Sequence, residues 1–331
     1  MAEQLDEVIA HSRTMIERGS KSFARAASLM PADIRDSVYM LYAWCRYCDD
    51  CIDDQHLGFA QPDAHSDSAL DERVRMLRQK TLGACQGVPD GVEFEALARV
   101  VEKHAIPECF PLDLIAGFAM DAADHRYSTE EDTLTYCYHV AGTVGLMMAM
   151  VMGVRDRPIL LRACDLGIAF QLTNISRDVT TDAQMGRVYL PQQWLEEYHL
   201  PPRSIGDPAH REVALQVVRR LLGLADRYYD SAGYGIARLP YRCAWSIASA
   251  LRIYRAIGTT ILTRGPSAWD SRVTTSKNQK LAHVALAIGD AAWAGSVGRI
   301  RDMPPRGPLW TPPALRGNGP SSTAAKETAA T

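Results

Sequence analysis

The sequence predicts an all-α protein folded as a single helical domain. Long segments carry apolar residues at spacings of three and four, which is the pattern of one buried helix face. The period-two alternation of β-branched residues that indicates strands is hard to find. The chain has 331 residues, of which 47% are hydrophobic, and this is enough to bury a sizeable core.

The predicted helices follow from their first turns and from the breakers between them. Pro31 and Pro111 each precede an acid in the first turn, Asp33 and Asp113, as is typical of a helix N-terminus. The stretch 140–154 has no charged residue but is too short to cross a hydrocarbon layer of ~30 Å, so we expect a buried core helix there. The predicted helices cover 31–54, 111–124, 130–154, 158–182, 208–233, 238–263 and 276–294.

The C-terminal residues differ in composition from the rest of the chain. From about residue 304 they are rich in Pro, Gly, Ser, Thr and Ala, with few large apolar side chains to offset the entropy of ordering them. We therefore expect residues 1–303 to form one helical domain and residues 304–331 to be a disordered tail. No linker or repeat elsewhere indicates a second domain.

Charge and cysteine content argue against several classes of function. A net charge of −3 with scattered Lys and Arg gives no basic patch for a phosphate backbone, so no nucleic-acid partner is expected. Eight cysteines without a framework spacing are typical of free thiols in a reducing compartment. The N-terminus carries acids where a cleavable targeting peptide would carry bases or a long apolar run. These features predict a cytoplasmic protein.

The first acidic cluster ends the predicted helix 31–54. Residues 38–48 are almost uncharged, yet they lead directly into Asp49, Asp50, Asp53 and Asp54. On a helix Asp49 and Asp53 share one face because they are four residues apart, and their carboxylates repel each other. The helix dipole also opposes acids at a helix C-terminus. This placement costs stability unless a cation compensates for it.

The second cluster lies at the end of the predicted helix 158–182. Asn174, Asp178 and Asp182 stack along one face at spacings of four. Oxygen ligands without a convergent His or Cys suit a hard cation such as Mg²⁺, for which Mn²⁺ can substitute. If the two acidic faces meet across a bundle, they form a cage for metal ions that carry a diphosphate. The alternative is that each cluster is a solvated helix face, which is usual for one Asp pair but less so for two.

Phosphate oxygens also require cationic partners. Arg46 lies one turn before the first cluster, Arg177 lies inside the second, and Lys21 is near the N-terminus. Each of these side chains can donate hydrogen bonds to a diphosphate, although any one of them alone would be ordinary on a protein surface.

Cys45, Cys48 and Cys51 have a spacing that is also found in iron–sulfur ligand sets. On a helix, side chains three residues apart drift around the axis, and no proline-flanked fourth cysteine follows. We therefore predict that these cysteines are structural thiols.

Together these residues resemble the trans-isoprenyl diphosphate synthases of the squalene and phytoene synthase family, which join two prenyl diphosphates head to head. Within that family the chain is most similar to bacterial phytoene synthases. The resemblance covers about residues 19–254, in the family's order. The motifs that carry it are GSKSF at 19–23, LYAWCR at 41–46, the aspartates at 49–54, YCYHVAGTVG at 136–145, QLTNI at 171–175, RD at 177–178 and GRVYLP at 186–191.

The resemblance implies a class I terpenoid-synthase helical bundle with a central cavity. It places Asp49 and Asp53 in the first metal motif, and Asn174, Asp178 and Asp182 in the second. Contact with diphosphate or prenyl chain is implied at the matching positions Gly19, Ser20, Lys21, Ser22, Tyr42, Arg46, Gln171, Arg177 and Tyr254. Catalytic roles are implied for Asp49, Asp53, Asp178 and Asp182, and for Tyr136, which matches a tyrosine that steers the carbocation.

One departure from the family concerns Thr180 and Thr181. Many relatives have Gly-Glu at these positions, so an outer-shell role of that glutamate does not carry over to this chain. Bacterial phytoene synthases vary here, and the assignment of the metal motif itself is unchanged.

The implied activity is that of a Mg²⁺-dependent prenyl transferase without NADPH, which converts two molecules of geranylgeranyl diphosphate into phytoene. The carbocations require a dry, long cavity. A lipid-soluble product implies transient contact with the inner face of the membrane and with other carotenoid enzymes. Candidates for the cavity lining are Phe23, Tyr42, Ala141, Gly142, Gly145 and Phe170, although close helix packing explains the two glycines equally well.

Two alternatives stay open. Squalene, presqualene diphosphate and dehydrosqualene synthases use farnesyl diphosphate, and residue spacing does not fix the cavity depth that separates them from a phytoene synthase. A squalene synthase also needs NADPH, and the chain has no glycine-rich dinucleotide loop. From another class, the chain could be a non-catalytic assembly or binding relative. Retention of Asp49, Asp53, Asn174, Asp178 and Arg46 argues against it.

Overall fold

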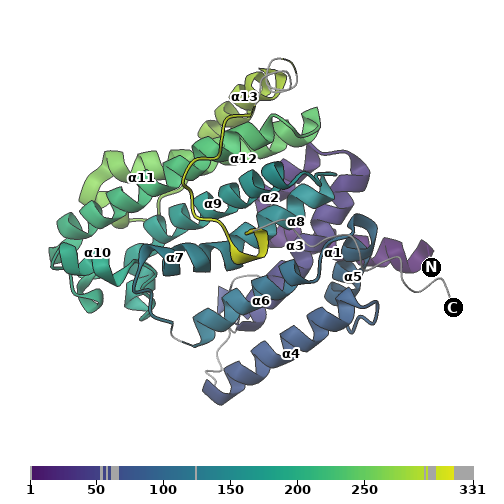
Figure 1. The fold of residues 1–331 in the computed structure, drawn as a ribbon, viewed down its shortest axis with the longest axis horizontal. Coiled ribbons are helices and arrows are strands. Elements are labelled where there is room, and N and C mark those ends of the chain that lie inside the picture. Colours follow the sequence, from purple (N-terminus) through teal and green to yellow (C-terminus); the bar gives the residue numbers. More distant parts are fainter. Residues whose placement is uncertain are drawn as a thin grey trace.

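The computed structural model of the chain describes residues 2–52, 55–56, 59–60, 67–123, 125–293, 296 and 303–316. Figure 1 shows a bundle of helices with α9 (Arg157–Gln184) in its middle. Helices α11 (Arg211–Ile236) and α12 (Tyr241–Arg264) pack along one side of α9, and α7 (Glu130–Cys137) and α8 (Thr143–Val151) along the other. The all-α class predicted from the sequence is confirmed.

The other elements follow in chain order. The N-terminal half contains α1 (Ala2–Gly19), α2 (Lys21–Ser28), α3 (Ala32–Ile52), α4 (Asp67–Cys85), α5 (Val92–His104) and α6 (Cys109–Ala122). Two short antiparallel strands, β1 (Gln55–His56) and β2 (Phe59–Ala60), follow α3. The C-terminal half contains α10 (Gln192–Glu197), α13 (Lys277–Trp293) and the 3-10 turns η2 (Pro202–Ser204), η3 (Pro208–His210), η4 (Gly265–Trp269) and η6 (Pro313–Leu315).

The seven helices expected from the sequence are all present, with ends shifted by a few residues. One of them is divided, because the five-residue π-helix η1 (Tyr138–Gly142) separates α7 from α8. A π-helix widens the turn and frequently occurs at functional sites. The helices α1, α2, α4, α5 and α10 were not among the segments singled out from the sequence.

The apolar core helix predicted at 140–154 corresponds to η1 and α8. Within the described residues, the continuous helical segment Glu130–Val151 is the one stretch long and apolar enough to cross a membrane. However, 61% of its most apolar window is buried inside the molecule, as expected of a core helix.

Glycines allow α8 and η1 to lie very close to α9. A Cβ on Gly145 would lie 2.3 Å from the carbonyl oxygen of Ala163, and one on Gly167 would lie 2.2 Å from that of Ala141. Real side chains do not tolerate such distances, so these positions require glycine. Of the two roles considered for Gly145, the structure favours close helix packing over lining a cavity.

The segment 303–316 forms a strap, shown in yellow in Figure 1, that crosses the bundle over α9. Arg306 forms an ion pair with Asp165 of α9, which is fully buried, and Leu315 is 5% exposed. Trp310 donates to Glu131 of α7 at 3.0 Å. These contacts correct the predicted disordered tail for residues 304–316, because ion pairs and hydrogen bonds order a segment that has few apolar side chains. Residues 317–331 lie outside the described part, and the domain boundary at 303 stays a proposal.

Candidate active site

The first acidic cluster lies at the C-terminal end of α3. Arg46 donates to Asp49 Oδ2 at 3.0 Å, and the same guanidinium lies 3.1 Å from Asp50 Oδ1. The Asp49 side chain is 40% exposed, whereas Asp50 is buried. One arginine therefore balances two acids that the helix dipole disfavours at this end. Asp53, the predicted second ligand of this cluster, and its neighbour Asp54 lie outside the described residues.

Asp178, in the second cluster, is held by two arginines. Arg177 Nε donates to Asp178 Oδ1 at 2.9 Å. Arg272, which follows η4, donates to the same carboxylate at 3.1 and 3.2 Å. Burial works to raise the pKa of the Asp178 carboxyl, but the hydrogen bonds and charges of the two arginines outweigh it, so the pKa lies below its ordinary value. Asp178 is therefore ionised at neutral pH.

Asn174, one turn before Asp178, carries a buried oxygen without a partner. Its Nδ2 donates to Gln171 Oε1 at 3.2 Å, which brings two of the predicted site residues together. Its Oδ1 is buried and has no hydrogen-bond partner. A buried acceptor without a hydrogen-bond partner lowers the stability of the fold unless a bound ligand supplies the partner. An amide oxygen one turn from a carboxylate fits the donor set of a hard cation.

Asp182 completes the predicted face of α9. Burial, and next the negative charge of Asp178, raise the pKa of Asp182 to about 7, against the opposing charges of Arg187 and Arg177. Without a cation, Asp182 is therefore about half protonated at neutral pH. A divalent ion would favour its ionised form, so the charge of this face fits a metal site as well as its spacing does.

The predicted diphosphate residues near the N-terminus lie around the junction of α1 and α2. A Cβ on Gly19 would lie 2.6 Å from the hydroxyl of Tyr42, so these two residues are in close contact. Ser20 is the N-cap of α2, and its Oγ accepts a hydrogen bond from the backbone N–H of Phe23. Ser20 thus has a structural role whether or not it also touches substrate. The side chains of Lys21 and Ser22 lie outside the described part of the chain.

Aromatic rings adjoin the α9 cluster. The ring of Tyr254, on α12, is centred 4.3 Å from that of Phe170, one turn before Asn174. Phe170 is also 6.1 Å from the ring of Tyr229 on α11. Burial raises the pKa of the Tyr254 phenol, while the nearby charge of Arg177 acts in the opposite direction. Three helices therefore contribute to one group of rings, and its member Tyr254 lies near the charges of Arg177 and Asp178.

Tyr136 belongs to a cluster of tyrosines around an acid. Its ring stacks on that of Tyr189 at 4.7 Å, and Tyr127 lies 5.4 Å away. The hydroxyls of Tyr136 and Tyr189 both donate to Asp121, at 3.1 and 2.9 Å. Burial raises the pKa of the Tyr136 phenol well above its usual range, so the hydroxyl stays protonated at neutral pH.

Asp121 and Arg272 are site residues that the sequence did not single out. Asp121 ends α6, and its negative charge contributes to the raised pKa of Asp182. The sequence does contain a signal for Asp121, because this acid lies at the end of a mainly apolar helix, as the acids of the first cluster do. No motif surrounds Arg272, which lies in an irregular segment and reaches Asp178 only through the fold.

The described residues fit a hard cation on α9 better than a transition metal or a cluster. Within the described ranges, no group of three or more His, Cys, Asp and Glu side chains is placed to hold a metal ion. The α9 face has two such residues beside Asn174, whose orphaned oxygen is the observation that fits Mg²⁺. None of the eight cysteines forms a disulfide. That the α3 and α9 clusters converge stays a prediction.

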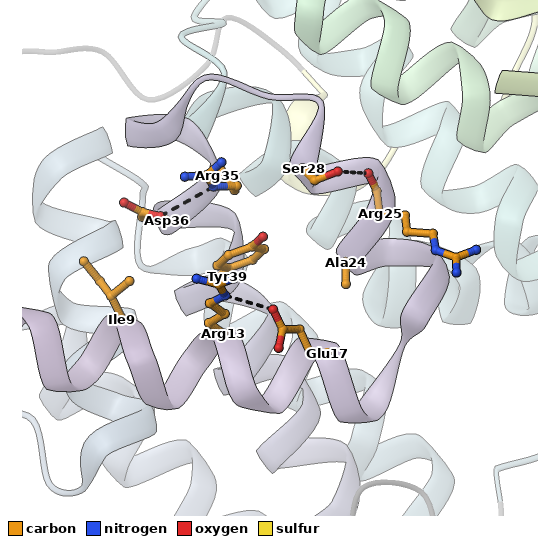
Figure 2. A pocket seen from close by; sticks show the side chains of 9 residues that line it. All are labelled: Ile9, Arg13, Glu17, Ala24, Arg25, Ser28, Arg35, Asp36 and Tyr39. Atoms are coloured by element: carbon orange, nitrogen blue, oxygen red, sulfur yellow. Dashed lines mark hydrogen bonds and ion pairs between the residues drawn. The ribbon is translucent and has the colours of Figure 1, made fainter. Parts of the chain in front are cut away.

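A surface pocket of about 440 Å³ lies between α1, α2 and α3 (Figure 2). Its charges are largely paired internally, Arg13 with Glu17 at 2.8 Å and Arg35 with Asp36 at 3.8 Å. Figure 2 shows the Arg25 guanidinium directed away from the pocket. The pocket includes none of the acids described above, so we do not place the substrate there. Its lining residues are Ile9, Arg13, Glu17, Ala24, Arg25, Ser28, Arg35, Asp36 and Tyr39.

The sequence of the chain identifies its family. Residues 16–279 match the family model described as squalene/phytoene synthase, which is most of the chain. The chain belongs to the squalene/phytoene synthase family. All the acids and arginines described above for the α3 and α9 clusters lie within the matched residues.

Individual members of the squalene/phytoene synthase family align over nearly the whole chain. A 15-cis-phytoene synthase of Paracoccus sp. is 50% identical over 289 residues, which cover 87% of this chain and 93% of the relative. A 15-cis-phytoene synthase of Enterobacter agglomerans is 47% identical over 298 residues, which cover 90% of this chain and 100% of the relative. The crystal structure of a dehydrosqualene synthase in complex with ligand superposes with a TM-score of 0.77 at 27% identity, covering 87% of this chain and 97% of that chain.

As a squalene/phytoene synthase, the chain is an enzyme that uses prenyl diphosphates. The helical terpenoid-synthase fold expected from the resemblance is confirmed by the superposition with the dehydrosqualene synthase. Which prenyl diphosphate it takes, and what each site residue does, belongs to the proposal that follows.

Proposed function

We propose that this chain is a 15-cis-phytoene synthase. It condenses two molecules of geranylgeranyl diphosphate through prephytoene diphosphate, with release of diphosphate, as the first step of carotenoid biosynthesis. The observation that carries the proposal is the identity of 50% and 47%, over nearly full lengths, to two proteins named 15-cis-phytoene synthase. The site supports it, because oxygen donors on α9 lie beside arginines and apolar rings, the two environments that a diphosphate with a long prenyl chain needs.

The proposed Mg²⁺ ligands are Asn174, Asp178 and Asp182 of α9, together with Asp49 and Asp53 of the first cluster. Mg²⁺, when bound, supplies Lewis-acid stabilisation of the negative charge that develops on the leaving diphosphate. The nearby arginines are already positioned at the carboxylates, Arg46 at Asp49 and Arg177 at Asp178. Their guanidinium groups would donate hydrogen bonds to diphosphate oxygens.

The carbon chemistry requires protection of a cation from water. Departure of diphosphate from one substrate leaves an allylic cation, which the double bond of the second substrate attacks, and loss of a proton gives a cyclopropyl diphosphate. A second ionisation, rearrangement and proton loss give phytoene. The rings of Phe170, Tyr254 and Tyr136 are suited to exclude water and to stabilise positive charge through their π faces. The Tyr136 phenol, whose pKa burial raises, stays protonated and offers a neutral ring to the cation.

Product analysis tests the choice of substrate. The purified chain is incubated separately with labelled farnesyl and geranylgeranyl diphosphate, with Mg²⁺ and with a chelator. We expect a C40 hydrocarbon from the C20 substrate, only when Mg²⁺ is present and without NADPH. A C30 hydrocarbon from the C15 substrate alone would refute the proposal in favour of a dehydrosqualene synthase, the activity named in the superposed structure.

A substitution in the first cluster tests whether the chain is catalytic at all. Asp49→Asn should abolish turnover and leave the melting temperature nearly unchanged, because the side chain is 40% exposed. Asp36→Asn, on the same helix but in the separate pocket, is the matched control and should retain activity. Full activity in the Asp49 variant would contradict the metal assignment and favour a non-catalytic relative.

A further inference from the structure

The hydroxyl of Tyr127, a residue shortly before α7, is a buried polar group without a hydrogen-bond partner. The Tyr127 residue is 4% exposed, and its hydroxyl oxygen forms no hydrogen bond with any described residue. Burial, and next the negative charge of Asp121, raise the pKa of this phenol, while the charge of Arg187 acts in the opposite direction. The hydroxyl therefore stays protonated at neutral pH and has one proton to donate.

The tyrosines around Tyr127 have already donated their protons. The Tyr127 ring is centred 5.4 Å from that of Tyr136 and 5.6 Å from that of Tyr189. The hydroxyls of Tyr136 and Tyr189 donate to Asp121, one to each carboxylate oxygen. Tyr127 thus shares the ring cluster of these two residues, but its hydroxyl has no acceptor in the part of the chain that the structure describes.

Backbone contacts hold the Tyr127 ring in this cluster. The Tyr127 carbonyl accepts a hydrogen bond from the Gln192 backbone N–H at 2.7 Å. Thr133 of α7 donates from its hydroxyl to the Tyr189 carbonyl at 2.9 Å. The segment that carries Tyr189 is therefore tied to the residues before α7 and to α7 itself. Turning the Tyr127 hydroxyl toward solvent would disrupt these contacts, so the donor is fixed in the interior.

The same two charged residues lie near Tyr127 and near the acids of α9. The charges of Asp121 and Arg187 act on the Tyr127 phenol, and they also act on the carboxyl of Asp182. Asp182 is one of the proposed Mg²⁺ ligands, and Mg²⁺ commonly binds through carboxylates together with substrate phosphates. A prenyl chain has no hydrogen-bonding atom. The acceptors that a prenyl diphosphate can bring to this donor are therefore the diphosphate oxygens.

We propose that the Tyr127 hydroxyl donates a hydrogen bond to a diphosphate oxygen of the bound substrate. Tyr127 is then a diphosphate-binding residue that lies outside the sequence motifs of the family. A hydrogen bond from a neutral donor to an ionised acceptor is about twice as strong as one between neutral groups, so a single hydroxyl contributes measurably to affinity. The inference rests on the proposed function, because it takes Asp182 as a Mg²⁺ ligand and a prenyl diphosphate as the substrate.

Calorimetry of the full chain with inorganic diphosphate and Mg²⁺ tests the proposal. Tyr127→Phe keeps the ring and removes only the hydroxyl, so the Kd of diphosphate should rise about tenfold or more. The melting temperature of the ligand-free variant should be unchanged or higher, because a buried donor without a partner is removed. Tyr39→Phe is the matched control. Tyr39 is 6% exposed and lines the separate pocket of Figure 2, so this variant should bind diphosphate like the wild type.

An unchanged Kd in Tyr127→Phe would overturn the proposal. A lower melting temperature at unchanged Kd would assign the hydroxyl to the fold instead. Product analysis separates this result from the proposed function. A raised Kd in Tyr127→Phe, with a C30 product from the wild type, supports the Tyr127 contact and refutes the proposed function alone. A C40 product from the wild type, with equal Kd in both proteins, refutes the Tyr127 contact alone.

Discussion

One face of α9 places a buried polar atom without a hydrogen-bond partner close to two carboxyl groups of different charge state. The Asn174 oxygen is buried and orphaned, and the pKa of Asp182 is raised to about 7. Asp178, between them, has two arginine partners. Oxygen donors and arginines thus lie together on this face, which is the combination that a cation and a phosphate require.

The variant Asn174→Leu tests separately how the unpartnered Asn174 Oδ1 affects the free energy of unfolding and how it affects metal binding. We expect the metal-free variant to be more stable by about 1 kcal/mol, because a buried unsatisfied acceptor is removed. The Mg²⁺ concentration for half-maximal activity should rise at least about tenfold. Urea unfolding in a chelator and a Mg²⁺ titration of turnover check the two effects. A variant with an unchanged Mg²⁺ requirement would show that Asn174 is not a ligand.

Asp182→Asn tests the raised pKa through the pH dependence of stability. In the unfolded chain this carboxyl titrates near 4, and in the folded metal-free chain at about 7. The folded state therefore holds the proton more tightly, and the stabilisation is lost as the pH rises from about 4 to 7. Asparagine cannot ionise, so the variant should gain on the order of 3 kcal/mol relative to wild type between pH 4.5 and 8. A difference in unfolding free energy that is independent of pH would contradict the assignment.

At the scale of elements, glycines determine how closely η1 and α8 approach α9. Gly167→Ala should destabilise the protein by about 3 kcal/mol, because its Cβ would lie 2.2 Å from the Ala141 carbonyl oxygen. Gly223→Ala on α11 is the matched control. No atom lies within 4 Å of a Cβ there, so the higher helix propensity of alanine should stabilise the protein by about 1 kcal/mol. Thermal unfolding of both variants measures the difference, and equal effects would refute the packing role.

The strap supplies Arg306, the cationic partner of a carboxylate that is buried in the core. Arg306 donates to the fully buried Asp165 at 2.8 Å and also holds the Trp310 carbonyl at 2.7 Å. Arg306→Met removes the ion-pair partner of that carboxylate, which keeps the hydrogen bond from Ser231, and should cost about 3–5 kcal/mol. In the double variant Asp165→Asn/Arg306→Met part of this loss should be recovered, because no buried carboxylate is left without its ion pair, although the buried Arg162 loses the nearby negative charge of Asp165. Denaturant unfolding measures the free energy of unfolding of the single and double variants. Equal losses of this free energy in both variants would contradict the ion pair as the cause.

At the scale of the whole molecule, the central prediction is that helices α3 and α9 hold one ligand together. Mg²⁺ with inorganic diphosphate should raise the melting temperature more than either alone, since binding to the folded state alone stabilises it by about 2.7 kcal/mol at one hundred times Kd. Asp49→Asn and Asp178→Asn should each abolish the shift. Loss of the shift in only one of these variants would mean that the two clusters act separately.

The sequence determined the helical class, the family and most of the acids, because spacing along a helix is a local property. Asp49, Asn174 and Asp178 could be found in this way, since residues four apart share a face in any helix. Local patterns also placed the ends of seven helices within a few residues.

Only the tertiary structure decided which distant groups meet. It joined Arg272 to Asp178 and Asp121 to Tyr136 and Tyr189, pairs from elements that no local spacing relates. It also ordered the strap, whose composition alone predicts disorder, because the binding partner of Arg306 is a buried acid more than a hundred residues away. Contacts of this kind depend on how helices pack, and packing is a property of the whole chain.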